Sequence, residues 1–237
     1  MKTDGVIALI PAWNEGTRLE PVVRETRTYL PVLVVDDGSE DETASIAESA
    51  GATVIRHATN QGKGVALVNG FKWCWDHGYE AALTLDADGQ HDPHDIPKFL
   101  AAYEAGAGDL IIGRRDFSKM PFPRGHTNPF GSWLLSKAIG APIHDNQSGY
   151  RLYTRSLIER VNLTASGFEL EVEVIAEAVR QGIPIGWVDI ETIYGIGKRS
   201  NFHPITDTVR FLQMVWRVYR EQRRRRIVQP TTRSPRT

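Results

Sequence analysis

The chain has 237 residues, of which 41% are hydrophobic and 24% charged. This is the composition of a folded globular protein, and it excludes collagen-like, low-complexity and intrinsically disordered chains. The single cysteine, Cys74, excludes an intramolecular disulfide and favours a reducing compartment. No apolar run approaches the ~20 residues of a membrane-spanning helix, and no signal peptide is evident, so we expect a cytoplasmic protein.

Charge is distributed unevenly along the chain. From Arg217 to the C-terminus there are eight arginines and one acidic residue, Glu221, whereas acidic side chains are in excess over the rest. A basic tail favours contact with an anionic membrane surface. Binding to nucleic acid is not expected, because the acidic body would repel a phosphate backbone.

In the first half of the chain, short apolar runs alternate with segments of helical periodicity. The apolar runs predict strands at 6–12, 32–35, 53–56, 81–85 and 109–113, and the periodic segments predict helices at 17–30, 40–50, 64–77 and 94–105. A capping box from Ser39 to Glu42 is expected to begin the second helix. This alternation predicts an α/β fold with a mostly parallel sheet, in which ligands bind at the carboxyl ends of the strands.

The second half is less regular. We expect loops at 118–125 and 195–204, helices at 130–139, 168–181 and 206–225, strands at 149–153 and 185–190, and a disordered tail from about 229. The last helix has an apolar stripe of Val209, Leu212, Val215 or Trp216, and Tyr219. The stripe fits an interfacial helix on an anionic membrane, and it equally fits a helix that packs on the body with the stripe buried.

Two acidic pairs follow predicted strands. Asp86 and Asp88 stand two residues apart just after an apolar strand, where both carboxylates can face one Mg²⁺ or Mn²⁺ ion. Asp36 and Asp37 follow a neighbouring strand, and their carboxylates suit the N–H groups of a base and the hydroxyls of a ribose. Each pair alone also fits ordinary turn or cap chemistry.

A glycine-containing segment from Asn60 to Gly64 opens a predicted helix. Helix N-termini favour phosphate, and glycine lets the backbone approach a ligand. The segment lacks the first glycine of a Walker A loop, and no dinucleotide-binding glycine motif occurs in the chain.

Four motifs now stand in order: Ile10 to Glu15, Val35 to Ser39, Asn60 to Gly64, and Asp86 to Pro93. Together they resemble glycosyltransferase family 2, most closely its dolichol-phosphate mannosyltransferase and polyprenyl-phosphate glycosyltransferase branch. The resemblance implies a GT-A fold, a three-layer α/β sandwich that binds a nucleotide-diphospho-sugar.

The resemblance also implies roles for residues of these motifs. Asp86, Asp88 and Gln90 would bind the metal, which neutralises the charge that grows on the leaving nucleoside diphosphate. The donor nucleotide would be held by Pro11, Ala12, Glu15, Asp36, Asp37 and Lys63.

Three later segments resemble further elements of the family. Gly113 to Arg115 resembles a Gly-Ser-Arg element with Arg114 in place of serine, Asp145 to Arg151 resembles the acceptor motif, and Phe168 to Glu171 resembles the segment that follows it. An acceptor phosphate would be met by basic side chains, namely Arg115, Arg124, Arg151, Lys198 and Arg199. Surface ion pairing is the alternative for these arginines. A hydroxyl acceptor would need a general base, for which Asp145 or Glu169 is available.

These expectations combine into one hypothesis. Residues 1–202 form a GT-A catalytic domain, 203–226 an amphipathic basic helix and 227–237 a disordered tail. The enzyme is an inverting, Mg²⁺- or Mn²⁺-dependent glycosyltransferase that moves mannose or glucose from GDP or UDP to a polyprenyl phosphate. It would work at the periphery of the cytoplasmic membrane face. Transfer to a soluble hydroxyl acceptor, a sugar nucleotidyltransferase and a non-catalytic nucleotide-sugar-binding module are the alternatives.

Overall fold

The computed structural model describes residues 2–120, 124–161, 163, 167, 169–193 and 211–220, without the side chains of residues 2, 3 and 124–126. Three side chains expected to meet the acceptor phosphate therefore lie outside the described part of the chain: those of Arg124, Lys198 and Arg199. The loop predicted at 195–204 and both ends of the last predicted helix also lie outside it.

A seven-stranded sheet forms the centre of the molecule, in the order β3-β2-β1-β4-β6-β5-β7. β6 runs antiparallel to both of its neighbours, β4 and β5, and the other pairs are parallel. The predicted, mostly parallel α/β architecture is confirmed. The strands are β1 (Val6–Ala12), β2 (Val32–Asp36), β3 (Thr53–Arg56), β4 (Ala81–Thr84), β5 (Leu110–Arg115), β6 (Arg151–Thr154) and β7 (Ile185–Ile190).

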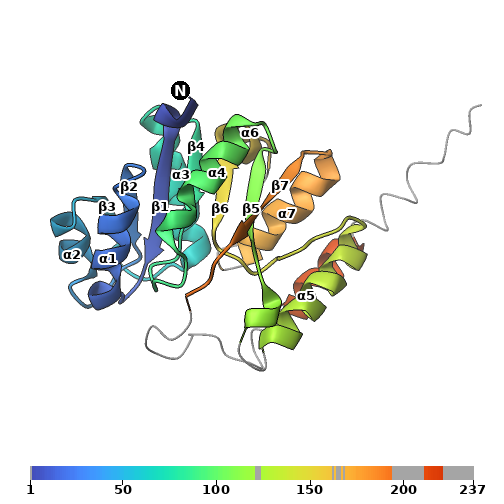
Figure 1. The fold of residues 1–237 in the computed structure, drawn as a ribbon. Coiled ribbons are helices and arrows are strands. Elements are labelled where there is room, and N and C mark those ends of the chain that lie inside the picture. Colours follow the sequence, from blue (N-terminus) through green and yellow to red (C-terminus); the bar gives the residue numbers. More distant parts are fainter. Residues whose placement is uncertain are drawn as a thin grey trace, which may run out of the picture.

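Helices cover both faces of the sheet, which gives three layers (Figure 1). One core cluster joins the sheet to α3, α5, α6, α7 and the helix at 211–220, and the other joins it to α1, α2 and α4. The central strands β1 and β2 are apolar up to the terminal Asp36 of β2, because both of their faces are buried. The helices are α1 (Gly16–Thr26), α2 (Thr43–Ser49), α3 (Lys63–Asp76), α4 (Ile96–Glu104), α5 (Arg124–Ile139), α6 (Arg155–Arg160) and α7 (Glu169–Gln181), with single 3-10 turns η1 (Lys2–Gly5), η2 (Pro93–Asp95) and η3 (Phe117–Lys119).

Tertiary contacts changed some of the predicted elements. The capping box at Ser39 does not form: the Ser39 hydroxyl accepts from the backbone N–H of Asn14 at 2.9 Å, and α2 begins only at Thr43. The predicted helix at 130–139 begins earlier, at Arg124. Helix α6 was not predicted; its N-cap is Thr154, whose hydroxyl accepts from the N–H of Leu157 at 3.2 Å.

Residues 211–220 form a helix that packs on the body through Met214, Val215 and Val218. This buried stripe differs from the predicted one, since Leu212, Trp216 and Tyr219 are exposed. The helix therefore packs on the body, although through a different stripe from the one expected. Among the described residues, no helix is both long enough and apolar enough to cross a membrane.

Candidate active site

The predicted motifs meet at the carboxyl ends of β1, β2 and β4, which are adjacent strands of the sheet. The turn after β1 is fixed by Asn14, whose φ of 54° lies in the left-handed region. Its side-chain oxygen accepts from the N–H of Glu40 at 2.9 Å, so the turns after β1 and β2 are tied together. Within β1, the carbonyl of Ala12 accepts from the N–H of Asp37 at 2.8 Å, and Pro11 lies in register with Val35.

The two carboxylates of the first acidic pair are both buried but are held differently. Asp36 accepts from the N–H of Ser39 at 3.0 Å and forms an ion pair with Arg56 at 3.2 Å. Asp37 accepts from the backbone N–H groups of Gln61 and Gly62, at 2.9 and 2.7 Å. The Asn60 to Gly64 segment is therefore hydrogen-bonded to Asp37, and it lies beside the expected nucleotide site.

His57 completes this arrangement and was not among the predicted site residues. Its Nδ1 donates to Asp37 at 2.7 Å, and its Nε2 accepts from the side-chain amide of Asn69 at 3.0 Å. The two contacts fix the orientation of the imidazole and of the Asp37 carboxylate. The sequence gives one sign that His57 could orient Asp37, namely its position directly after the short strand β3.

The second acidic pair lies in a tight loop after β4. The backbone N–H of Asp86 donates to Nδ1 of His91 at 3.0 Å, and burial of His91 lowers the pKa of its imidazole against the opposing effect of Asp86 and Asp88. Asp88 accepts from the backbone and side-chain N–H groups of Gln90, at 3.0 and 2.5 Å. His91 stacks on Tyr150 with ring centroids 5.0 Å apart, which anchors the loop to the core.

Lys63, at the start of α3, reaches this loop. Its Nζ lies 2.6 Å from Oδ1 of Asp86 and 3.3 Å from Oε1 of Glu171, on α7. Burial by itself would lower the pKa of Lys63, but the charges of Asp86 and Glu171 outweigh it and raise that pKa. Burial likewise opposes the ionised form of Asp86, yet Lys63 and then His91 hold the pKa of its carboxyl well below the usual range.

Glu15 brings a further carboxylate to the same edge. Burial raises the pKa of Glu15, Arg18 lowers it, and the charges of Asp88, Asp41 and Asp86 raise it further. Glu15 is therefore close enough to Asp86 and Asp88 to be repelled by both.

The predicted acceptor motif packs directly against the second acidic pair. A Cβ built on Gly149 would lie 2.7 Å from Oδ2 of Asp86, so the backbone of this loop is in contact with the carboxylate. Asp145 is fully buried and binds Arg115 through two N–H···O bonds of 2.7 and 2.9 Å. It also accepts from the backbone N–H groups of Gln147 and Ser148, at 3.0 and 3.2 Å. These bonds hold the loop in place and engage both oxygens of the Asp145 carboxylate.

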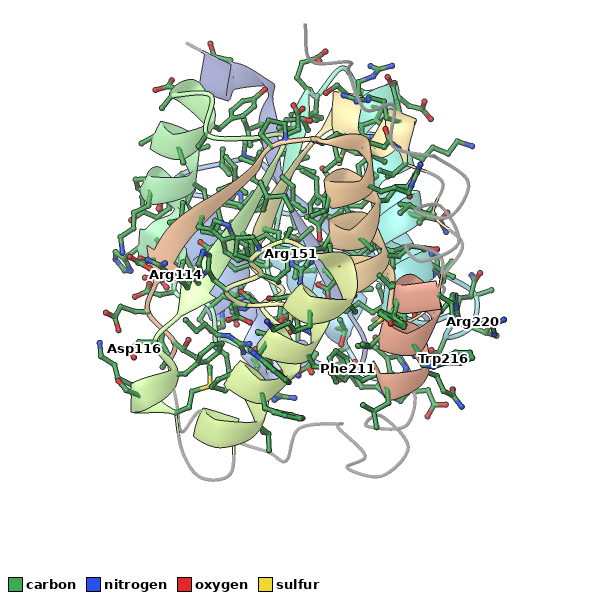
Figure 2. All side chains as sticks on the ribbon, turned by 90° about the vertical axis from the view of Figure 1, so that its right-hand side faces the viewer. Arg114, Asp116, Arg151, Phe211, Trp216 and Arg220 are labelled. Carbon is green, nitrogen blue, oxygen red and sulfur yellow. The ribbon has the colours of Figure 1, made fainter. Side chains whose placement is uncertain are left out.

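Arg151 does not lie where the sequence interpretation placed it. Its side chain is fully buried and donates to three backbone carbonyls, those of Ser148, Asn146 and Glu171, at 2.6, 2.9 and 2.6 Å. A guanidinium enclosed in this way holds the loop and α7 together. The guanidinium is thus engaged by the protein's own carbonyls, whereas the sequence interpretation expected it to meet an acceptor phosphate; Figure 2 marks its place.

The donor set at this edge suits a hard divalent cation. Asp86 and Asp88 supply carboxylate oxygens, the ligands that Mg²⁺ and Mn²⁺ prefer, and the Asp86 side chain is 32% exposed. Within the described part of the chain, no group of three or more His, Cys, Asp and Glu side chains forms a complete metal site. A site built on two carboxylates would leave the other coordination positions to water and phosphate oxygens.

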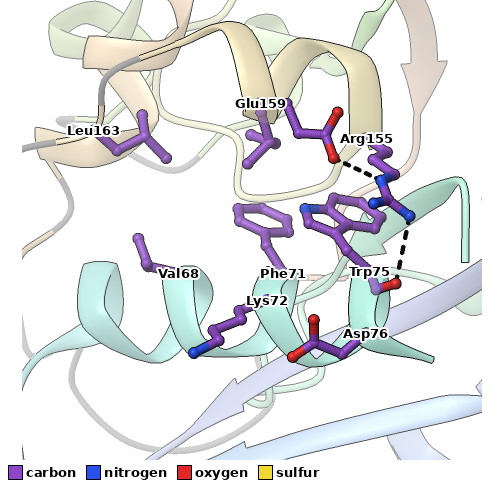
Figure 3. A pocket seen from close by; sticks show the side chains of 9 residues that line it. Val68, Phe71, Lys72, Trp75, Asp76, Arg155, Glu159 and Leu163 are labelled. Carbon is purple, nitrogen blue, oxygen red and sulfur yellow. Dashed lines mark hydrogen bonds and ion pairs between the residues drawn. The ribbon is translucent and has the colours of Figure 1, made fainter. Parts of the chain in front are cut away.

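Two hollows lie elsewhere on the surface. One of about 340 Å³ lies between α3 and α6, with the stacked rings of Phe71 and Trp75 on its floor and Arg155 and Glu159 at its rim (Figure 3). It contains none of the predicted site residues. The other, of about 650 Å³, lies between η3 and α5 and includes Phe117, two residues beyond Arg115.

Comparisons with known proteins agree with this geometry. A sequence model of glycosyl transferase family 2 matches residues 7–161. Polyprenol monophosphomannose synthase of Mycolicibacterium smegmatis is 31% identical over 84% of this chain and 82% of its own. UDP-N-acetylglucosamine–dolichyl-phosphate N-acetylglucosaminyltransferase of Methanococcus voltae is 29% identical over 80% of this chain and 86% of its own.

Among solved structures, glucosyl-3-phosphoglycerate synthase from Mycobacterium tuberculosis, in complex with Mn²⁺, uridine diphosphate and phosphoglyceric acid, superposes with a TM-score of 0.68. The match covers 92% of this chain and 77% of that one at 19% identity, and it shows the GT-A fold. Since the family match extends over more than half of the sequence, the chain is a glycosyltransferase and belongs to glycosyltransferase family 2.

Proposed function

We propose that the protein transfers mannose or glucose from GDP or UDP to a polyprenyl phosphate, with inversion at the anomeric carbon. The observation that carries this proposal is the convergence of Asp36, Asp37, Asp86 and Asp88 at one sheet edge, next to the loop that holds Arg115. The acceptor class is supported by the two relatives, whose names specify polyprenol and dolichyl-phosphate products or substrates.

The donor would bind along β1 and β2. Pro11, Ala12, Asp36 and Asp37 would hold the nucleoside, and Glu15 and Lys63 would lie beside its ribose and diphosphate. Asp86 and Asp88, with Gln90 next to them, would hold Mg²⁺ or Mn²⁺, which supplies positive charge to the diphosphate when bound. Support for the metal comes from the Mn²⁺ in the related solved structure and from the donor set described above.

The chemistry is a single displacement. An acceptor oxygen forms a bond to the anomeric carbon while the bond to the nucleoside diphosphate breaks, and the electron pair leaves with the diphosphate. A phosphate monoester is already anionic near neutral pH, so this reaction needs no strong general base. Asp145 is already engaged by Arg115 and two backbone N–H groups, so of the two predicted bases Glu169 is the one left for a hydroxyl acceptor.

The acceptor phosphate would approach from the side of β5. Arg115, which is 15% exposed, ends this strand, whereas Lys198 and Arg199, expected in the same role, lie outside the described residues. The hollow of about 650 Å³ next to η3 includes Pro129, Trp133 and Ile143, which are apolar side chains suited to the first isoprene units.

We also propose that the helix at 211–220 contacts an anionic membrane. Its exposed face carries Leu212, Trp216 and Tyr219, and Arg220 lies over the Trp216 ring at 4.4 Å (Figure 2). Apolar and aromatic side chains next to arginines are typical of helices that lie in a lipid interface.

The test is label transfer. Purified protein with Mn²⁺ or Mg²⁺ is given radiolabelled GDP-mannose or UDP-glucose, with and without a polyprenyl phosphate, and label is counted in the organic phase. We expect transfer from one donor that requires both lipid and metal. Asp88→Asn should lower the rate at least ~100-fold while circular dichroism stays unchanged, because the metal loses a carboxylate.

Three outcomes would contradict parts of the proposal. Full activity of Asp88→Asn would exclude the metal assignment. Metal-dependent donor hydrolysis without lipid labelling would exclude the lipid acceptor. A protein that neither transfers nor hydrolyses any donor in the panel would contradict the catalytic assignment itself.

A further inference from the structure

Two carboxylates from distant parts of the chain share one ammonium group at the centre of the site. Lys63 Nζ lies 2.6 Å from Oδ1 of Asp86, in the loop after β4, and 3.3 Å from Oε1 of Glu171, on α7. The Glu171 side chain is only 8% exposed, whereas those of Lys63 and Asp86 are 30% and 32% exposed. Lys63 thus links the buried carboxylate of Glu171 to the more exposed carboxylate of Asp86.

The position of Lys63 conflicts with cation binding at Asp86. An ammonium at hydrogen-bond distance from Oδ1 occupies the oxygen that a divalent cation would use, and two cations on one carboxylate repel each other. The carboxylate of Glu171 is an alternative partner for Lys63, because it already lies 3.3 Å from the ammonium group. No such partner was expected from the sequence, where Glu171 is one of several acidic residues near the start of α7.

We propose that Lys63 is a built-in counter-cation that competes with the divalent cation for Asp86, and that Glu171 is the positioning residue that retains Lys63 when the cation binds. This inference rests on the metal dependence proposed above. Lys63 would keep Asp86 oriented before the cation arrives. Glu171 would then hold the displaced ammonium close to the diphosphate, where a positive charge favours donor binding.

Glu171 is well fixed for this role. Its backbone carbonyl accepts from the guanidinium of Arg151 at 2.6 Å, and the same guanidinium binds the carbonyls of Asn146 and Ser148 at 2.9 and 2.6 Å. Gly149, next along that loop, is the residue in contact with Asp86. Asp86 and Glu171 are thereby held on either side of Lys63 by one buried side chain.

The experiment measures cation binding directly, without turnover. Mn²⁺ is titrated into the full-length protein in the absence of nucleotide, and free Mn²⁺ is read by electron paramagnetic resonance. We expect Lys63→Met to bind Mn²⁺ about 10-fold more tightly than wild type, because the competitor is gone. We expect Glu171→Gln to bind it about 10-fold more weakly, because Lys63 is left with Asp86 as its partner.

The double variant separates positioning from simple loss of charge. If Glu171 acts through Lys63, Glu171→Gln should change the Mn²⁺ dissociation constant less than ~3-fold in the Lys63→Met background. An equal weakening in both backgrounds would mean that Glu171 acts only as a negative charge, and would overturn its role as a positioning residue.

Matched controls exist on the same helices. Lys72→Met removes a charge from α3, and Glu177→Gln removes one from α7, where Glu177 pairs with Arg180. Both should leave Mn²⁺ binding unchanged. If Lys63→Met does not fold, Lys63→Gln is the second variant, because its amide still donates between the two carboxylates while the competing charge is removed.

The remaining outcomes distinguish this inference from the proposed function. Mn²⁺ binding by wild type that is not tightened in either Lys63 variant would overturn the inference alone. Absence of Mn²⁺ binding by folded wild type, even with GDP or UDP present, would overturn both the inference and the proposed metal dependence.

Discussion

Gly149 has no side chain at a place where Asp86 would leave no room for one. A Cβ there would lie 2.7 and 2.9 Å from the two carboxylate oxygens, closer than such atoms approach in folded proteins. The carbonyl of Gly149 is held by the hydroxyl of Thr84 at 2.7 Å, so the loop cannot easily retreat. The glycine is therefore required by the position of Asp86, and no positive φ is involved.

Gly149→Ala should accordingly displace Asp86 and lower turnover by about 100-fold, since misplacing a reacting or metal-binding group by ~1 Å has effects of this size. The rate of label transfer and the Mn²⁺ dissociation constant check this. Gly5→Ala is the control, because its Cβ would meet Glu80 at an ordinary 3.5 Å. Wild-type activity in Gly149→Ala would show that the carboxylate tolerates the displacement.

Elements far apart in the sequence are joined at this site by buried polar groups. Arg151, at the start of β6, binds the loop before it and the first turn of α7 through three carbonyls. Asp145 and Arg115 likewise join that loop to the end of β5. A fully buried charge is tolerated there because its hydrogen bonds replace water.

Arg151→Met should lower the free energy of unfolding by about 3 kcal/mol or more, because three carbonyls lose a charged donor. Arg151→Lys should recover part of this loss, since an ammonium reaches fewer of the three acceptors. Urea denaturation measures both. A variant with unchanged stability but a raised KM for polyprenyl phosphate would instead support the phosphate contact expected from the sequence.

At the scale of the whole molecule, α5 and the helix at 211–220 lie side by side at the end of the sheet where the site is found (Figure 1). A Cβ on Gly131 of α5 would meet the ring of Phe211 at 3.6 Å, so the two helices are in contact. Phe130 and Trp133 of α5 are 61% and 54% exposed and stack at 5.8 Å. The exposed aromatic side chains of both helices thus belong to one end of the molecule.

If this end meets a membrane, Trp216→Ser and Trp133→Ser should each weaken binding to vesicles of anionic lipid about 10-fold. Each substitution removes one large aromatic side chain that would insert into the lipid interface. Sedimentation with the vesicles measures it, and Trp187→Phe, a conservative change on β7, serves as the control. Equal binding by all variants would contradict a membrane contact through these helices.

Much of the fold could be read from the sequence because its signals are local. The strands β1, β3 and β7 begin and end as predicted, since each is a short apolar or alternating run bounded by turn residues. Predictions failed where a local signal met a long-range partner. The Ser39 hydroxyl binds Asn14 rather than its own helix, and the buried stripe of the last helix is the one that joins the core cluster, Met214, Val215 and Val218.

The sequence by itself determined the α/β fold, the family and the sheet edge where its acidic motifs gather, because apolar periodicity and motif order are properties of neighbouring residues. Only the tertiary structure decided how the charges of the site are paired. Asp37 meets His57, Lys63 meets both Asp86 and Glu171, and Arg151 turns inward to three carbonyls. Such pairings depend on which strand ends and helices become neighbours, and a buried charge must take whatever partner the packed fold brings within hydrogen-bond distance.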